Sequence, residues 1–63
     1  MCLSTVYKGE VSPANLILSN VQRMERRDGS IILTDLMERQ VAVEGEILMA
    51  DLVGGTVIIA PTV

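Results

Sequence analysis

The sequence predicts an all-β fold, either a small barrel or a rolled antiparallel sheet of six or seven short strands. Two observations support this prediction. Short segments alternate between apolar and polar residues and are rich in β-branched side chains. Turn-forming residues separate these segments at close intervals. Because 63 residues suffice for one domain only, we expect a single domain over residues 1–63.

The first strand is expected over residues 2–7, where side chains alternate between two faces. One face carries Leu3, Thr5 and Tyr7, and the other carries Cys2, Ser4 and Val6. Gly9 and Pro13 follow and end the strand pattern.

Residues 14–28 fit two alternatives. One alternative is a helix, with Ser12 as its N-cap, Pro13 at its first position and Gly29 just beyond its end. The other alternative is a strand at 16–18, a bend at Ser19 and Asn20, and a second strand at 21–27. Residues 30–34 form a clear strand, and Asp28-Gly29 is a typical two-residue hairpin turn before it. Because a hairpin needs a partner strand directly before its turn, we favour strands.

The last third of the chain has the most regular pattern. Residues 40–44 alternate, Gly45 indicates a bulge or bend, and apolar residues continue at 47–50. Gly54 and Gly55 predict a turn rather than a phosphate-binding loop, because the lysine and serine of such a loop are absent. A final strand is expected over residues 56–60, ended by Pro61.

The composition predicts self-association. A chain this short buries only about 60% of the surface that it exposes when unfolded, so its stability is marginal. One cysteine cannot form an intrachain disulfide, and the ligands of a structural zinc site are missing. Since 49% of the residues are hydrophobic, we expect some apolar surface to face a second copy in a homodimer.

The sequence also predicts a cytoplasmic location. No apolar run approaches the roughly 20 residues of a membrane span, and the start lacks the features of a signal peptide. A single free thiol suits a reducing compartment. The formal net charge of -3 gives no long-range attraction to nucleic acid or to anionic lipid.

Cys2 is the candidate for metal chemistry. A free cysteine often serves only as a small buried hydrophobe. A thiolate near the chain start could instead bind a divalent metal together with backbone nitrogens of Cys2 and Leu3, and nitrogen–sulfur sites of square-planar geometry suit Ni(II) or Cu(II). A two-fold axis near Cys2 would bring two thiolates to one ion.

The remaining polar side chains carry weaker predictions. We expect four carboxylates to be solvated charges at strand edges: Glu38, Glu44, Glu46 and Asp51. A local cluster of arginines could contact RNA phosphates, although we favour a solvated face or ion pairs between subunits; the cluster is Arg23, Arg26 and Arg27, with Arg39. The apolar positions of Met24, Met37 and Met49 indicate core filling. No histidine is present to serve as the usual base of a nucleophile, so we expect no enzyme.

The chain resembles the CooT family of small proteins over nearly its full length. The resemblance lies in the order and spacing of short motifs: Met1-Cys2-Leu3, Thr5-Val6-Tyr7, Asp28-Gly29, Leu33-Thr34-Asp35-Leu36, Val43-Glu44-Gly45 and Ala50-Asp51-Leu52. One departure is Met37-Glu38, where members often have an aromatic residue and a glycine.

The resemblance implies a homodimeric SH3-like or Sm-like barrel that binds Ni(II) and helps to supply nickel to carbon monoxide dehydrogenase. In that family the cysteine after the initiator methionine holds the metal at the dimer interface, and here this residue is Cys2. Two alternatives stay open. One is an RNA-binding barrel that uses Arg23, Arg26 and Arg27, and the other is a protein-interaction subunit without a ligand.

Overall fold

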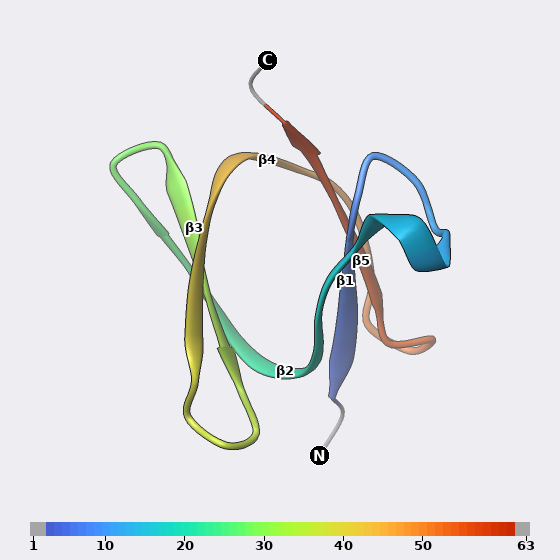
Figure 1. Ribbon diagram of the computed structural model, residues 1–63, viewed down its shortest axis with the longest axis horizontal. Helices are drawn as coiled ribbons and strands as arrows, with labels where there is room; N and C mark the ends of the chain where they lie inside the picture. The colour runs from blue at the N-terminus through green and yellow to red at the C-terminus, as the bar shows by residue number, and fades with distance from the viewer. Residues whose placement is uncertain (1–2, 62–63) are drawn as a thin grey trace.

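A computed structural model describes residues 3–61, which form a closed five-stranded β-barrel (Figure 1). The strands are β1 (Ser4–Lys8), β2 (Leu16–Arg27), β3 (Ser30–Asp35), β4 (Gln40–Asp51) and β5 (Thr56–Pro61). Strands adjacent in sequence pair antiparallel, and β1 closes the barrel by pairing parallel with β5. The predicted all-β fold is confirmed, with one parallel pair that a purely antiparallel sheet would not contain.

The prediction of six or seven strands was wrong, because two predicted breaks are bends within continuous strands. Asn20 adopts a φ of 56° inside β2, a conformation that asparagine tolerates better than most residues. Its carbonyl oxygen accepts a hydrogen bond of 2.9 Å from the amide of Leu36. Gly45 is buried inside β4, where that strand passes from β3 to β5. Each long strand therefore serves two neighbours in succession.

The hairpin between β2 and β3 is confirmed. Asp28 and Gly29 both have positive φ, at 53° and 82°, as the tight turn requires. The helix signals at Ser12 and Pro13 produce only one 3-10 turn, Pro13–Asn15, which precedes β2. The strand alternative for residues 16–27 was therefore correct.

The core is aliphatic and small. Among residues 3–61, six hydrophobic side chains are buried in it: Val6, Val21, Ile31, Leu33, Val57 and Ile59. In β1 and β5, the inward residues alternate with partly exposed ones, as expected for strands that bury one face. Across residues 3–61, no helix has the length and apolar character needed to cross a membrane.

One end of the barrel, called the lower end here, holds the beginning of β1 together with two turns (Figure 1). These turns are residues 36–39, between β3 and β4, and residues 52–55, between β4 and β5. The predicted turn at Gly54 and Gly55 is confirmed, with Gly55 at a φ of 74°.

Candidate functional site

The predicted metal ligand, Cys2, lies outside the described residues, but its attachment point is well defined. The amide of Thr5 donates a hydrogen bond of 2.8 Å to the carbonyl oxygen of Gly55. A Cβ atom on Gly55 would lie 2.9 Å from the carbonyl oxygen of Leu3, so the chain passes very close to this turn. The 52–55 turn thus holds the first residues of β1 at the lower end of the barrel.

The turn itself is held by Asp51. The Asp51 Oδ1 atom accepts a hydrogen bond of 2.8 Å from the Gly54 amide, and the Asp51 carbonyl accepts one of 2.8 Å from the Gly55 amide. This carboxylate therefore already has a structural partner. The next two residues of the turn, Leu52 and Val53, project into solvent with exposed fractions of 67% and 98%.

The described part of the chain contains no ready-made metal cluster. Among residues 3–61, no three histidine, cysteine, aspartate or glutamate side chains are grouped so that they could hold an ion. The whole chain has no histidine and a single cysteine. Cys2 is therefore the only thiol that this chain could offer to a metal.

Asp35 is a structural residue that the sequence analysis did not single out. Its side chain is buried, with 1% of the residue exposed at the end of β3. Oδ1 accepts hydrogen bonds of 2.9 Å from the amides of Met37 and Arg39, and Oδ2 accepts one of 2.8 Å from Arg39 Nε. The carboxylate thereby closes the 36–39 turn. An aspartate directly after an apolar strand was the available signal for this role.

The environment of Asp35 holds its pKa below the ordinary value of 3.8. Burial of the carboxylate acts in the opposite direction and raises the pKa. The hydrogen bonds from Arg39 and Met37, with the charge of the Arg39 guanidinium, outweigh burial. The ionised form of Asp35 is therefore the form that the folded protein favours.

Replacing Asp35 with asparagine should lower the stability of the protein at neutral pH. The variant should also lose less stability than the unmodified protein when the pH is lowered into the acid range. The asparagine amide would place a donor against Arg39 Nε, which is itself a donor. The pKa of Asp35 is lower in the folded protein than the ordinary value of 3.8. The contribution of Asp35 to stability is therefore complete above pH 3.8, and it is lost as the pH falls below 3.8 and through the pKa of the folded state. Urea unfolding midpoints between pH 7 and pH 2.5 measure both effects.

Asp28→Asn is the matched control for this prediction. Asp28 is an exposed turn residue at positive φ, a conformation that asparagine also accepts. Its acid profile should follow that of the unmodified chain. Equal acid profiles for Asp35→Asn and Asp28→Asn would contradict the role given to Asp35.

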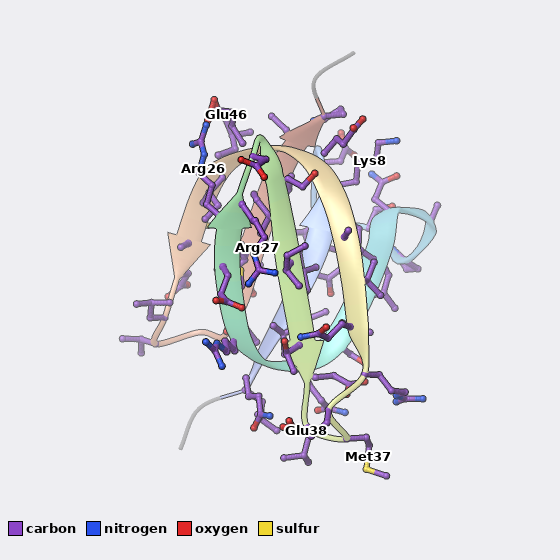
Figure 2. All side chains as sticks on the ribbon, turned by 90° about the vertical axis from the view of Figure 1, so that its left-hand side faces the viewer. Lys8, Arg26, Arg27, Met37, Glu38 and Glu46 are labelled. Carbon is purple, nitrogen blue, oxygen red and sulfur yellow. The ribbon has the colours of Figure 1, made fainter. Side chains whose placement is uncertain are left out.

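The arginines lie on an exposed surface, as predicted, and they are paired with carboxylates of the same chain. Arg26 Nη1 lies 3.0 Å from Glu46 Oε1 at the upper end of the barrel (Figure 2). Glu25 Oε2 lies 3.2 Å from Arg23 Nη2 and 3.6 Å from Arg27 Nη2. These pairs are largely exposed, so each contributes about 0–1 kcal/mol to stability. The guanidinium groups are not gathered into an unopposed basic patch.

The other predicted side chains separate into two groups. The four carboxylates at residues 38, 44, 46 and 51 are exposed, as predicted. Met24 packs against the core, also as predicted. The prediction was wrong for Met37, which is 71% exposed and points outward from the 36–39 turn (Figure 2). The prediction was also wrong for Met49, which is 38% exposed.

A pocket of about 710 Å³ opens at the upper end of the barrel, away from the beginning of β1. Its lining includes Lys8, Ile17, Ser30, Glu44 and Ile59. This volume lies in the range of small-molecule sites, but the lining is mostly aliphatic and its polar groups do not form a nucleophile–base pair. The pocket therefore adds no catalytic machinery to the described residues.

The fold and the sequence together define a small all-β protein with a single thiol, Cys2. The chain belongs to the CooT family, because the family model described as "CO dehydrogenase accessory protein CooT" matches residues 1–60. The suspected resemblance is thus confirmed, and with it a CO dehydrogenase accessory role.

A solved structure supports the fold independently. A protein from Carboxydothermus hydrogenoformans assigned to CooT superposes with a TM-score of 0.86 at 13% sequence identity. The superposition covers 98% of this chain and 100% of the other. No curated protein is similar enough in sequence to count as a match.

Proposed function

We propose that this protein, as a single domain over residues 1–63, is a homodimer that binds Ni(II) as cargo for the maturation of carbon monoxide dehydrogenase. Membership of a family of CO dehydrogenase accessory proteins is the observation that carries this proposal. In the proposed site, Cys2 of each chain supplies a thiolate to one shared ion. Backbone nitrogens of Cys2 and Leu3 complete the ligand set.

The chemistry of the chain supports Cys2 as the ligand. It is the only thiol, and no imidazole is present to replace it. The described residues offer no alternative cluster of three ligands. Thiolate and amide nitrogen are donors that suit square-planar Ni(II). Because one thiol per chain makes a poor soft site, a second chain supplies the missing donor.

The position of β1 also supports a site at the chain start. The beginning of β1 is fixed by the hydrogen bond from Thr5 to Gly55 and by the close approach of Leu3 to Gly55. Thr5 is three residues after Cys2 in the sequence. A preorganised attachment lowers the conformational entropy that metal binding must overcome. The proposed partners are carbon monoxide dehydrogenase or its maturation proteins, and the proposed location is the cytoplasm.

Nickel titration of the reduced full chain tests this function. A thiolate-to-nickel absorption band should saturate at one Ni(II) for two chains. Cys2→Ser should reduce the affinity by at least about 100-fold, since loss of supporting groups alone costs 10–100-fold. Ser4→Ala, two residues further along the chain, is the control and should keep the band.

Three results would decide against parts of this proposal. Unchanged nickel binding by Cys2→Ser would exclude Cys2 as the ligand. Saturation at one Ni(II) per chain would keep Cys2 but exclude the shared ion. Absence of any band in the unmodified protein would reject the nickel function.

The RNA-binding alternative gains no support from the geometry. Arg23, Arg26 and Arg27 each have a carboxylate within 3.6 Å. The only aromatic side chain of the chain, Tyr7, is on β1 rather than in the β2 segment that bears the arginines. Stacking platforms beside a basic groove are the usual requirement for single-stranded RNA.

A further inference from the structure

Strand β4 changes its neighbour along its length and leaves one of its edges open. Residues 40–44 pair with β3, and residues 45–51 pair with β5 on the other side of the strand. A β-strand directs the backbone N–H and C=O groups of alternate residues to its two sides. Among residues 3–61, no strand pairs with the second side of residues 40–44.

The β2–β3 hairpin determines which residues direct their backbone groups to this open side. Arg27 and Ser30 flank the two-residue turn, so they exchange hydrogen bonds and the backbone groups of Ser30 point to β2. Alternation then directs the groups of Ile31 to β4, where Val43 lies directly opposite. The preceding residue of β4, Ala42, consequently directs its N–H and C=O groups away from β3.

Two hydrogen bonds at the far end of β3 agree with this alternation. The amide of Asp35 donates a hydrogen bond of 2.9 Å to the carbonyl oxygen of Arg39, on the β4 side. The amide of Leu36 donates one of 2.9 Å to the carbonyl oxygen of Asn20, on the β2 side. Odd-numbered residues of β3 therefore face β4, and even-numbered residues face β2, along the whole strand.

We call the second side of β4 at Gln40 and Ala42 the open edge. Both residues direct their backbone groups to this side, and neither has a backbone partner there among residues 3–61. Residues 40–43 carry no charge and no proline, which are the features that usually protect a strand edge from pairing. The open edge thus offers alternating donors and acceptors, a pattern that the backbone of an extended peptide complements.

The pocket of about 710 Å³ lies beside the open edge. Ala42 and Val43 of β4 line it, together with Ile17 of β2 and the fully buried Ile59 of β5. In a strand added to the open edge, alternate side chains would enter this pocket and the others would face solvent. Because the lining is mostly aliphatic, the pocket favours aliphatic side chains at those alternate positions.

Lys8 adds a charge preference to this site. It is the only lysine of the chain, it is exposed at the end of β1, and it lines the same pocket. No carboxylate of the described residues lies within 4.0 Å of its amino group. By contrast, Arg26 and Glu46 line a second pocket of about 230 Å³ and pair with each other at 3.0 Å, well apart from Lys8 (Figure 2).

We propose that an extended segment of a partner protein binds to the open edge as an additional strand. Its backbone pairs with Gln40 and Ala42, its alternate aliphatic side chains enter the pocket, and an acidic side chain reaches Lys8. Residues 40–44 span about 17 Å as a strand, so four or five residues of the partner suffice. The site is at the upper end of the barrel, so this inference is independent of nickel binding and leaves the lower end uncovered.

Amide hydrogen exchange of the full chain, measured by NMR, tests the open edge before any partner is added. The Ala42 amide should exchange at least about 10-fold faster than those of Val41 and Val43, which the ladder with β3 protects. Equal protection of the three amides in the free protein would overturn the proposal, because the edge would then already be covered.

Selection from a phage-displayed library of short random peptides, with the full chain as bait, tests the ligand class. Selected peptides should carry aliphatic residues at alternate positions and at least one aspartate or glutamate. Their binding, followed by fluorescence anisotropy, should also slow the exchange of the Ala42 amide. Methylation of the backbone nitrogens that pair with the open edge should weaken binding by at least about 10-fold, since it removes the donors.

Ala42→Pro tests the same hydrogen bonds from the side of the protein. Proline is tolerated at a strand position whose N–H points away from the ladder, so this variant should fold. It should bind the selected peptides at least about 10-fold more weakly. Lys8→Glu should weaken binding of the acidic peptides by a similar factor of about 10 or more. Arg26→Ala, at the other pocket, is the matched control and should bind normally.

The outcomes distinguish the proposed partner from other occupants of the site. Failure to select any peptide, or equal binding of methylated and unmethylated peptides, would overturn strand addition even if Ala42→Pro did not fold. Displacement of the peptides by octanoate, with no effect of Ala42→Pro, would assign the pocket to a small aliphatic carboxylate instead. A dimer of the unmodified chain that Ala42→Pro dissociates, in sedimentation velocity, would assign the open edge to a second copy.

Discussion

Alanine at position 45 should reduce the stability of the protein by about 3 kcal/mol or more, the upper range for overpacked sites. A Cβ atom there would lie 2.3 Å from the carbonyl oxygen of Ala60 and 3.0 Å from Ile59 Cγ2. The oxygen belongs to the backbone of β5, so relief requires movement of a whole strand. Small single cores rarely supply more than about 3–5 kcal/mol, so most of Gly45→Ala should be unfolded at 37 °C.

Gly9→Ala and Gly29→Ala are the controls for this prediction. Both glycines have positive φ, at 83° and 82°, but a Cβ atom on either would meet nothing within 4 Å. They should lose only the cost of a left-handed backbone, about 1–2 kcal/mol. Urea unfolding followed by circular dichroism ranks the three variants. A loss at Gly45 no larger than at Gly29 would refute the close approach of β4 and β5.

Leu33→Ala is the second substitution with a large expected effect. Leu33 is 0% exposed, and it is among the largest fully buried side chains of the described core. Truncating a buried leucine typically costs 2–5 kcal/mol, and about that loss is expected here. The barrel strands are hydrogen-bonded around the cavity that would remain, so they cannot collapse freely to fill it.

Leu36→Ala tests whether burial, rather than leucine chemistry, causes the loss. Leu36 is three residues further along the chain and is 52% exposed. Its truncation should change stability by less than about 0.5 kcal/mol, as for most surface substitutions. Thermal and urea unfolding of both variants provide the comparison. Similar losses at positions 33 and 36 would contradict the assigned core.

Local patterns predicted most of the strands because their causes are local. Alternation of side chains identified β1, and apolar runs bounded by turns identified β3 and β5, all to within about two residues. Asp28-Gly29 identified the hairpin turn. The strand count failed at Asn20 and Gly45. Both residues are typical strand breakers, and only the neighbouring strands decide whether such a residue ends a strand or bends it.

Non-local features could not be predicted from the sequence. The parallel pairing of β1 with β5 and the burial of Asp35 both depend on contacts that form in the folded barrel. For the candidate site, composition marked Cys2 as the only thiol, and the family match supports an accessory role. The open edge of β4 became visible only once the strand register was known.

The parallel closure of the barrel has a consequence for synthesis on the ribosome. Thr5 pairs with Thr56, which is added about fifty residues later, and contacts so distant in sequence form slowly. Until β5 emerges, β1 has one open edge and the nascent chain cannot close its core. Any site that depends on the closed end of β1 is therefore completed only after β5 has been translated.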